Sequence, residues 1–439
     1  MSKIKLKKFP HPYNAGLAIC SDIDGTSWDN FLKIHTFLNS EKESDFGRGL
    51  SLPISSSFWM YDQPNLRDAA FSYFKDKNGI ESKIAPVMRE LIRAGILDVM
   101  HGYGNFADVN DFSRALADQA LNELEKHRLK IKVWTNHGGV ESAQNIGQYS
   151  AGKGDIKIKK SELTKEKTDF YHLDLLMKHG IQFFWDSEAS LTSIVGQDRK
   201  FHFGEAYWNS PLFTGFKPKI KITAKGILSF VDKNYFNFFK HHFTPWQPYN
   251  SNNELMKTET LRDGNNLKKF IRFGNGRFDW QEHLTLLLNN RVLERLLEKK
   301  GYLVVYIHLG DKLNKADPGA LSLPVIDKFH QLKDLYLSGD LWIETTSRLL
   351  TYNYVYNSLN WNFSETETHY QINIKDEIKH ESKLELAVSD LAGLSFIAPG
   401  DKEVLIFFKD KPLKFKIYQN PGENKQTAMI PLKSTEWLL

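Results

Sequence analysis

The sequence of 439 residues contains a single cysteine, Cys20. No disulfide can form within the chain, and a zinc site built on cysteine ligands is excluded. No window holds the roughly 18 apolar residues that a membrane-spanning helix needs. No apolar segment of signal-peptide length follows the basic residues at the start. We therefore expect a soluble, cytoplasmic protein with no membrane span.

A concentrated charge of one sign is also missing. Lys and Arg number 58 and Asp and Glu 53, which gives a formal net charge of +5. The basic residues are scattered, and many of them stand beside acidic ones. The only basic run, Lys3–Lys8, is expected to be a solvated terminus. A nucleic-acid-binding protein would carry a denser basic patch, so we expect no nucleic-acid partner. The oligomeric state is left open.

The remaining composition is that of an ordinary globular protein, with 41% hydrophobic and 13% aromatic residues. A chain of this length exceeds one compact core, and it indicates two domains or one large barrel with an appendage. The aromatic residues suit a large core and equally suit a groove that faces carbohydrate.

Apolar runs alternate with helical patterns from about residue 16 to residue 359. The sequence predicts strands at 16–21, 50–55, 96–100, 131–134, 181–185, 269–273, 302–307 and 341–343. It predicts helices at 28–38, 84–94, 112–127, 169–179, 280–299, 324–337 and 347–359. Alternating strands and helices imply a parallel sheet, and continuous apolar strands imply burial on both faces. The predicted fold class is α/β, with a distorted, seven-stranded (β/α) barrel.

Two segments depart from this alternation of strands and helices, and they determine the predicted domain organisation. An insertion at about 186–266 holds strand-like runs at 220–223 and 227–231 and the pair His241 and His242. After residue 362, β-type runs at 370–374, 383–388, 403–408 and 413–418 are separated by turn residues, with no helix evident. We therefore expect a barrel domain over 1–362 and a small β-sandwich-like domain over 363–439.

Polar residues follow several of the predicted strands. Asp22 and Asp24 follow the first, in Ser-Asp-Ile-Asp-Gly-Thr, and His101, His137 and His308 each follow a later one. In parallel α/β folds the loops at strand carboxyl ends build the active site. One acid can bind a metal while the other takes a proton from water, and imidazole is a good zinc ligand. Taken singly, Asp-Gly is a common turn and a loop His is a common surface residue.

This pattern resembles the polysaccharide deacetylase (NodB-homology, carbohydrate esterase) superfamily. There an acidic pair ends the first strand, a His motif follows a later strand, and a late strand ends in His. The run Gly339–Tyr352 is similar to the closing strand and helix of that barrel. The resemblance covers about residues 15–360, and its motifs are loose.

The resemblance implies a metal-dependent hydrolase that removes N-acetyl or related acyl groups from a sugar or polysaccharide. Asp22 would be the general base and His308 the general acid. The metal would be Zn²⁺, with Co²⁺, Ni²⁺ or Mg²⁺ as alternatives, and its expected ligands are Asp24, His101, Asn105 and His137. Substrate contacts are expected from Trp134, Arg272 and Trp342.

The chain departs from the family pattern at three points. Ile23 separates the two acids, which are usually adjacent, and Asn105 stands where a second metal-binding His is usual. The family's Arg-containing motif has only loose candidates, Arg272 and Arg277 near Trp280. These departures leave room for a weakened metal site, an altered substrate or an inactive relative.

Two other interpretations remain open. Asp-x-Asp-Gly-Thr also opens haloacid-dehalogenase-type phosphatases, in which Asp22 would be the nucleophile with Mg²⁺, and Asp311 and Asp317 would imitate the late acidic motif. That interpretation leaves the three His residues without roles and lacks a convincing strand-end Lys. A catalytically inactive carbohydrate-binding protein is the other alternative, and it would carry no metal.

Overall fold

The structure is a computed structural model of the whole chain. It describes residues 3–62, 69–106, 111–138, 142–147, 169–186, 189–190, 194–198, 253–274, 280–310, 321–378, 386–420 and 422–433, with the single residues 220, 224 and 227. The chain forms two compact units. The larger unit comprises Leu17–Lys333, Glu344–Ser347 and Thr435–Leu439, and the smaller unit comprises Met1–Gly16, Asp334–Ile343 and Arg348–Ser434.

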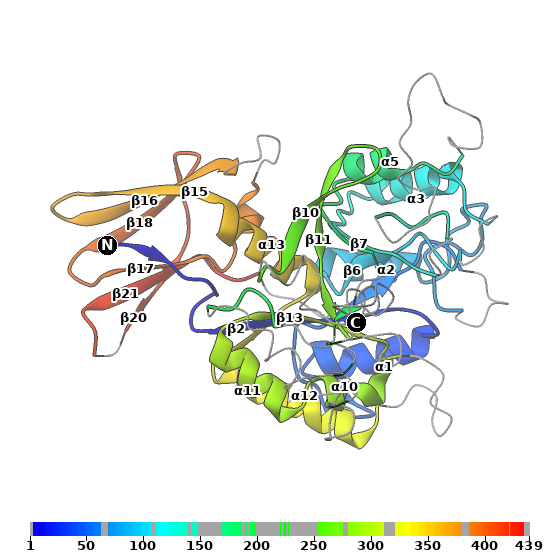
Figure 1. Ribbon diagram of the computed structural model, residues 1–439, viewed down its shortest axis with the longest axis horizontal. Helices are drawn as coiled ribbons and strands as arrows, with labels where there is room; N and C mark the ends of the chain where they lie inside the picture. Colours follow the sequence, from blue (N-terminus) through cyan, green and yellow to red (C-terminus); the bar gives the residue numbers. More distant parts are fainter. Residues whose placement is uncertain are drawn as a thin grey trace. The chain divides into compact units, whose positions relative to one another are not determined.

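A large, mostly parallel sheet forms the centre of the larger unit (Figure 1). Its strands follow the order β10-β11-β8-β7-β6-β5-β2-β13-β12-β9. Their bounds in chain order are β2 Ala15–Ser21, β5 Ser55–Phe58, β6 Leu97–His101, β7 Val133–Thr135, β8 Phe183–Trp185, β9 Ala189–Ser190, β10 Met256–Thr260, β11 Asn266–Phe270, β12 Arg272–Phe273 and β13 Tyr302–Ile307. β10 pairs antiparallel with β11, whereas the pairs β11–β8, β12–β13, β12–β9, β2–β5, β5–β6, β6–β7 and β7–β8 are parallel. The mixed α/β class predicted from the sequence is confirmed.

The strands are buried along most of their length, as their apolar sequences require. All seven residues of β2 are buried, and so are all residues of β6, β7 and β8. Helices cover the sheet, with α3 and α5 above the strands in Figure 1 and α1, α10 and α11 below them. The helices of this unit are α1 Trp28–Asn39, α2 Ala85–Ala94, α3 Arg114–Lys126, α5 Leu173–His179, α10 Leu284–Leu287 and α11 Asn290–Lys299. Most of α12 Leu323–Leu337 also belongs to it, whereas most of α13 Thr346–Ser358 belongs to the smaller unit.

Two predicted elements of the larger unit were wrong in their bounds. The helix predicted over 280–299 is broken into η2 Gln281–His283, α10 and α11, because the Asn289 side chain accepts from the Val292 amide and caps a new helix start. The strand predicted at 50–55 begins only at Ser55. The preceding residues instead bond to the end of α1, with the Leu50 amide donating to the Phe37 carbonyl.

Most of the predicted insertion lies outside the described residues, including His241 and His242. Residues 220 and 227, where the sequence predicts strand-like runs, are helical. The end of the insertion supplies β10, which pairs with β11 at the edge of the sheet. No helix in the described segments is long and apolar enough to cross a membrane.

The smaller unit contains two four-stranded sheets, with the orders β1-β17-β21-β20 and β15-β16-β18-β19. The strands are β1 Lys5–Leu6, β15 Leu359–Glu365, β16 His369–Ile378, β17 Ser395–Pro399, β18 Glu403–Phe408, β19 Lys411–Pro412, β20 Lys416–Gln419 and β21 Lys425–Met429; β14 Leu341–Ile343 also belongs to this unit. The ring of Trp361 on β15 lies 5.1 Å from the ring of Phe396 on β17, so the sheets contact each other.

The basic run at the start forms β1, in which Lys5 and Leu6 pair with Ile397 and Phe396 of β17 while the Lys3 and Lys5 residues stay exposed. One expectation for this unit was wrong, because it contains a short helix, η3 Val388–Leu391, where the sequence predicts the end of a strand. Asp390 explains the helix start, since its carboxylate accepts from the Ala387 amide.

Candidate metal centre

Five predicted polar residues come together at the carboxyl ends of neighbouring strands. Asp22 and Asp24 follow β2, His101 ends β6, His137 lies two residues after β7, and His308 follows β13. These strands lie close to one another in the sheet order β7-β6-β5-β2-β13. Parallel strands end at one edge, and this common edge brings the side chains together.

Asp24 lies at the centre of three imidazoles. Its Oδ1 atom lies 3.5 Å from His101 Nε2 and 3.6 Å from His137 Nε2. Its Oδ2 atom lies 3.3 Å from His308 Nε2. The His101 and His137 rings are 4.9 Å apart, centroid to centroid. One carboxylate thus contacts residues from three different strand ends.

The spacing of these atoms fits a bound cation better than hydrogen bonds. Asp24, His101 and His137 each offer one ligand atom, and the three atoms lie within 4.8 Å of one another. Ligands about 2.0–2.1 Å from a tetrahedral zinc ion stand about 3.3 Å apart, close to the separations found here. Asp24 Oδ1 is buried and accepts no hydrogen bond within the described residues. A carboxylate and two imidazoles therefore fit a divalent cation, and no ion identity follows from the geometry.

The orientation of His101 suits a metal ligand. Its Nδ1 atom lies 2.7 Å from Thr135 Oγ1 and 3.4 Å from Asp22 Oδ1. Metal-binding imidazoles commonly donate their second ring N–H to such a partner, which fixes the tautomer and the ring plane. With Nδ1–H donating to Thr135, the lone pair of Nε2 is directed to Asp24.

The backbone around His137 is held by a short loop. The His137 amide donates to Asn145 Oδ1 at 3.0 Å, and the Asn136 side chain donates to the Ile146 carbonyl. Trp59 packs edge-on against the His137 ring, with centroids 4.9 Å apart. The loop thus fixes the backbone of His137, and Trp59 fixes the plane of its imidazole ring.

Gly102 lets the chain turn directly after His101. Its φ of +60° lies in the left-handed region, which is costly for other residues. A Cβ atom there would stand 2.7 Å from Gln144 Oε1. That oxygen accepts from the Tyr103 amide, and the same side chain donates to the Gly104 carbonyl. Glycine is therefore required for this turn to pack against Gln144.

Asp22 forms a buried ion pair with Arg272. Arg272 NH1 lies 3.0 Å from Asp22 Oδ2, both side chains are 0% exposed, and Arg272 NH2 donates to the Cys20 carbonyl. The guanidinium also contacts the neighbouring rings of Trp185 and Tyr306, 4.5 and 4.2 Å from their centroids. Such contacts stabilise a cation that has left water.

The neighbouring charges set the ionisation of both acids. Burial alone would raise the pKa of Asp22, but Arg272, with His101 and His308, holds this pKa at about 2. Burial likewise favours the neutral form of Asp24, but the imidazoles of His137, His101 and His308 outweigh burial and hold the pKa of Asp24 below its usual range. Both carboxylates are therefore ionised at neutral pH. The Cys20 thiol nearby is inert, because burial raises its pKa to about 12.

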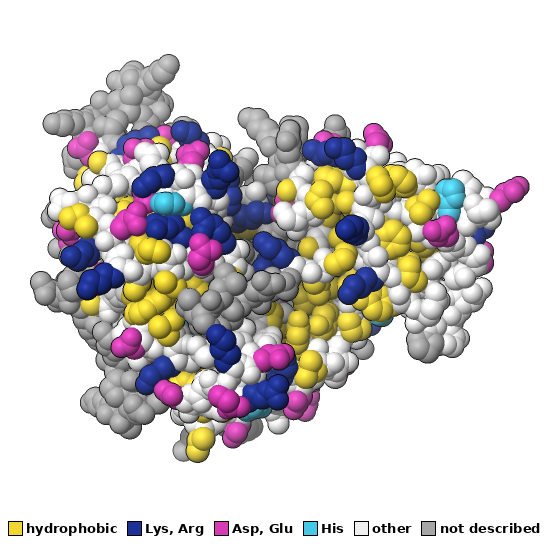
Figure 2. Space-filling view, turned by 180° about the vertical axis from the view of Figure 1, so that it is seen from behind, with side chains coloured by type: hydrophobic (Ala, Val, Ile, Leu, Met, Phe, Trp, Pro, Cys, Tyr) yellow, Lys and Arg dark blue, Asp and Glu magenta, His cyan; other side chains and the backbone are white. Residues whose placement is uncertain are grey.

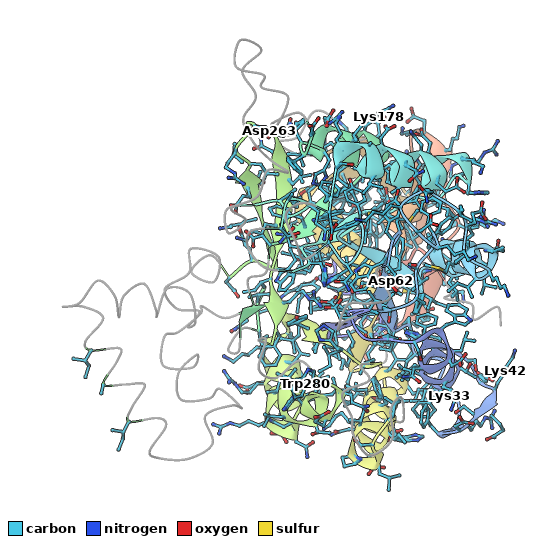
Figure 3. All side chains as sticks on the ribbon, turned by 90° about the vertical axis from the view of Figure 1, so that its right-hand side faces the viewer. Lys33, Lys42, Asp62, Lys178, Asp263 and Trp280 are labelled. Carbon is cyan, nitrogen blue, oxygen red and sulfur yellow. The ribbon has the colours of Figure 1, made fainter. Side chains whose placement is uncertain are left out.

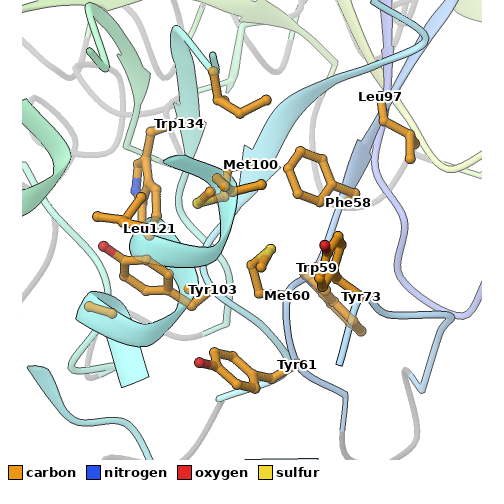
Figure 4. Close-up of a cluster of buried hydrophobic side chains, with 14 of the residues drawn as sticks. Phe58, Trp59, Met60, Tyr61, Tyr73, Leu97, Met100, Tyr103, Leu121 and Trp134 are labelled. Carbon is orange, nitrogen blue, oxygen red and sulfur yellow. The ribbon is translucent and has the colours of Figure 1, made fainter. Parts of the chain in front are cut away.

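Asn105 and Trp134 take other positions. Asn105 is buried, and its amide nitrogen makes no hydrogen bond within the described residues. Trp134 points to the opposite face of β7 from Thr135, because side chains alternate along a strand. It packs on Tyr103 in the hydrophobic core (Figure 4) and is 0% exposed. A ring buried in this way has no face open to a sugar.

Trp342 lies on β14 in the smaller unit, buried with its ring 4.9 Å from that of Tyr352. Arg272 lies beside Asp22, as described above, with its guanidinium fully covered. Arg277, Asp311 and Asp317 lie outside the described residues. The substrate contacts predicted from the sequence thus consist of three buried side chains.

Sequence reasoning gave no role to several residues around the cluster. Three of them, Trp59, Trp185 and Tyr306, lie near the ends of strands, and this position in the sequence could have indicated that they border the cluster. Trp280 is 41% exposed and is labelled in Figure 3. Its backbone forms a parallel bridge with His308. This pairing across 28 positions could not be read from the sequence.

No family model, no curated protein and no solved structure matches the chain.

Proposed function

We propose that the chain is a metal-dependent hydrolase of the polysaccharide-deacetylase type, removing N-acyl groups from a sugar or polysaccharide. The observation that carries the proposal is the position of Asp24, whose two carboxylate oxygens contact His101, His137 and His308. The buried Asp22–Arg272 pair beside it supports the same assignment.

We also propose that the parallel strands close into a seven-stranded barrel. β11 pairs with β8, and after the single residue Ile271 the chain continues as β12, which pairs with both β9 and β13. If β11 and β12 act as one strand, and β8 and β9 as another, the ring runs β2, β5, β6, β7, β8/β9, β11/β12, β13 and back to β2. A closed ring directs all its strand ends to one mouth.

In this proposal Asp24, His101 and His137 hold the cation. We take His137 as the third ligand, because its Nε2 atom lies 3.6 Å from Asp24 Oδ1. A divalent cation, when bound, supplies Lewis-acid polarisation of a carbonyl oxygen and of water. Zn²⁺ is favoured by the two imidazoles and one carboxylate, with Co²⁺ and Ni²⁺ as alternatives.

Asp22 and His308 would handle the protons. Asp22 is ionised beside Arg272, and its Oδ1 atom, which accepts no hydrogen bond within the described residues, would take the proton from water. A cavity of about 10 Å³ borders Asp22, which is room for about one water molecule. His308 Nε2 lies 3.3 Å from Asp24 Oδ2, at the edge of the cluster, and a protonated His308 would give its proton to the leaving amine.

Trp280 would be the aromatic surface for the sugar. It is 41% exposed, and its backbone pairs with that of His308, the proposed acid. Aromatic rings that are open to solvent can cover the apolar face of a sugar ring. This gives the substrate-facing role to Trp280 in place of Trp134 and Trp342.

The alternative functions fit less well. The phosphatase interpretation gives no role to the three imidazoles that contact Asp24. A binding protein without metal gives no reason for Asp24 Oδ1 to be buried between two imidazoles without a hydrogen bond. Neither alternative gains a specific observation from the described residues.

The test combines metal analysis with acetate release from N-acetylglucosamine oligomers. The purified protein should carry about one equivalent of Zn²⁺, lose acetate release on chelation and regain it with Zn²⁺. Asp22→Asn and His308→Asn should keep the metal and lose a hundredfold or more in rate, on the order of a general acid–base contribution. Hydrolysis of an aryl phosphate that requires Mg²⁺ and not Zn²⁺ would favour the phosphatase. Protein that binds no metal and releases no acetate would refute the proposal.

A further inference from the structure

A hollow of about 670 Å³ lies on the smaller unit, remote in sequence from the metal centre. Three separate stretches line it: the η3 helix and the residue after it, the β18–β19 turn with the residues that follow, and the chain after β21. Its lining includes Val388, Leu413 and Ile430, which are aliphatic, and Lys411, Lys414 and Lys433 at its rim. Figure 2 shows apolar side chains interspersed with basic ones over this unit, on the right of the view.

The rim carries positive charge that the described residues do not neutralise. The side chains of Lys411, Lys414 and Lys433 are exposed, and none makes an ion pair or a hydrogen bond with any described residue. Lys409 is the exception, with its ammonium 3.3 Å from Asp376 Oδ2. No Asp or Glu belongs to the lining within the described part of the chain. The hollow therefore combines an aliphatic floor with a cationic rim.

Protection of a sheet edge explains only part of this arrangement. β19 is the edge strand of its sheet, and Lys and Pro on an edge strand prevent pairing with other chains. That accounts for Lys411 and Pro412. It does not account for Lys433, which lies on another segment, or for Val388, whose side chain is 56% exposed on η3.

We propose that this hollow binds an acidic polypeptide segment that carries aliphatic side chains. The aliphatic groups would enter the floor at Val388 and Leu413, and the carboxylates would meet the three lysines. Glycans and single-stranded nucleic acids bind chiefly by stacking on open aromatic faces. The aromatic residue of the lining is Phe408, which is only 4% exposed. The charge and the aliphatic floor together favour a peptide, and this inference does not depend on the hydrolase site.

The first test measures binding of a short fluorescent peptide of Glu, Asp and Leu to the full chain by anisotropy. Binding should weaken as ionic strength rises, because exposed charges are screened by salt. Lys411→Glu with Lys414→Glu should weaken it at least about tenfold. The matched control is Lys375→Glu with Lys416→Glu, two exposed lysines of the same unit outside the hollow, and it should change affinity less than about twofold.

The second test addresses the apolar floor. Val388→Asp should weaken peptide binding at least about tenfold, while Ile417→Asp should not, although both side chains are exposed in the wild type, at 56% and 41%. Equal thermal melting of the variants excludes loss of folding. The proposal would be overturned if the peptide did not bind at low salt, or if the hollow variants and the control variants lost equal affinity for it. Tighter binding of a sulfated oligosaccharide or of single-stranded DNA than of the peptide would also overturn it.

Discussion

Arg272 NH1 lies 3.0 Å from Asp22 Oδ2, and these two residues, 250 positions apart in the chain, form an ion pair that is wholly shielded from water. Removing one member of such a pair leaves the other charge buried and unpaired, which typically costs 3–5 kcal/mol. The pair therefore links the proposed base to the stability of the larger unit.

Arg272→Met should lower the free energy of unfolding by about 3–5 kcal/mol in urea titrations. Asp22→Asn introduced in the same chain should restore part of that loss, because no charge then remains buried. Arg48→Met, at an exposed position on the short strand β4 (Gly47–Arg48), serves as the control and should change stability by under about 0.5 kcal/mol. Equal stability of Arg272→Met and wild type would contradict the buried pair.

His101→Ala and His137→Ala should each weaken Zn²⁺ binding by at least about a hundredfold, since each removes one proposed ligand. Thr135→Val should weaken it about 10–100-fold by releasing His101 Nδ1. Titration of the metal-free protein with Zn²⁺ measures all three. His330→Ala removes an exposed imidazole on α12 and should leave the affinity unchanged.

Asn105→Ala distinguishes the two ligand sets that the sequence leaves open. Asp24, His101 and His137 form the group of converging ligand atoms, so this variant should keep Zn²⁺ affinity within about threefold of wild type. The same titration measures it. A loss as large as that of His137→Ala would restore Asn105 as a ligand and remove His137.

Gly102→Ala should destabilise the protein more than Gly264→Ala. Both glycines have positive φ, +60° and +89°, so both substitutions incur backbone strain of about 1–2 kcal/mol. Only at Gly102 does the added Cβ meet another group, Gln144 Oε1 at 2.7 Å, whereas Gly264 has open space around it. Urea unfolding of the pair isolates the cost of that contact. Equal losses would show that Gln144 moves away freely.

Stability should fall as the pH drops below about 6.5, in part because of His172. Burial lowers the pKa of His172 to about 3, so the folded state holds it neutral while the unfolded state takes up a proton near pH 6.5. This contribution is complete above pH 6.5 and is lost towards pH 3, at no more than about 1.4 kcal/mol per pH unit. His172→Gln should flatten the curve of unfolding free energy between pH 6 and pH 4. Parallel curves for the variant and wild type would contradict this.

The cluster could be predicted from the sequence because the carboxyl ends of parallel strands lie at one edge of the sheet, whatever the order of the strands. Asp22, Asp24, His101, His137 and His308 each needed only a correctly placed strand. The ion-pair partner of Asp22 could not be predicted in this way, because Arg272 begins strand β12 and does not follow the end of a strand.

The face of a strand was harder to predict than its end. β7 is buried on both sides, so its sequence does not alternate, and nothing in Val-Trp-Thr indicates which residue faces the cluster. Thr135 does and Trp134 does not. The pairing of β1 with β17 could not be predicted from the sequence either, because it joins residues almost 400 positions apart.

The lone thiol of Cys20 has a practical consequence. It is fully enclosed and its pKa is near 12, so maleimide reagents should not reach it in the folded protein. A cysteine introduced at Lys409, which lines the hollow but is not one of the proposed peptide contacts, would then be the single labelled position without any change to the native sequence elsewhere. A dye at that position would report occupancy of the hollow directly.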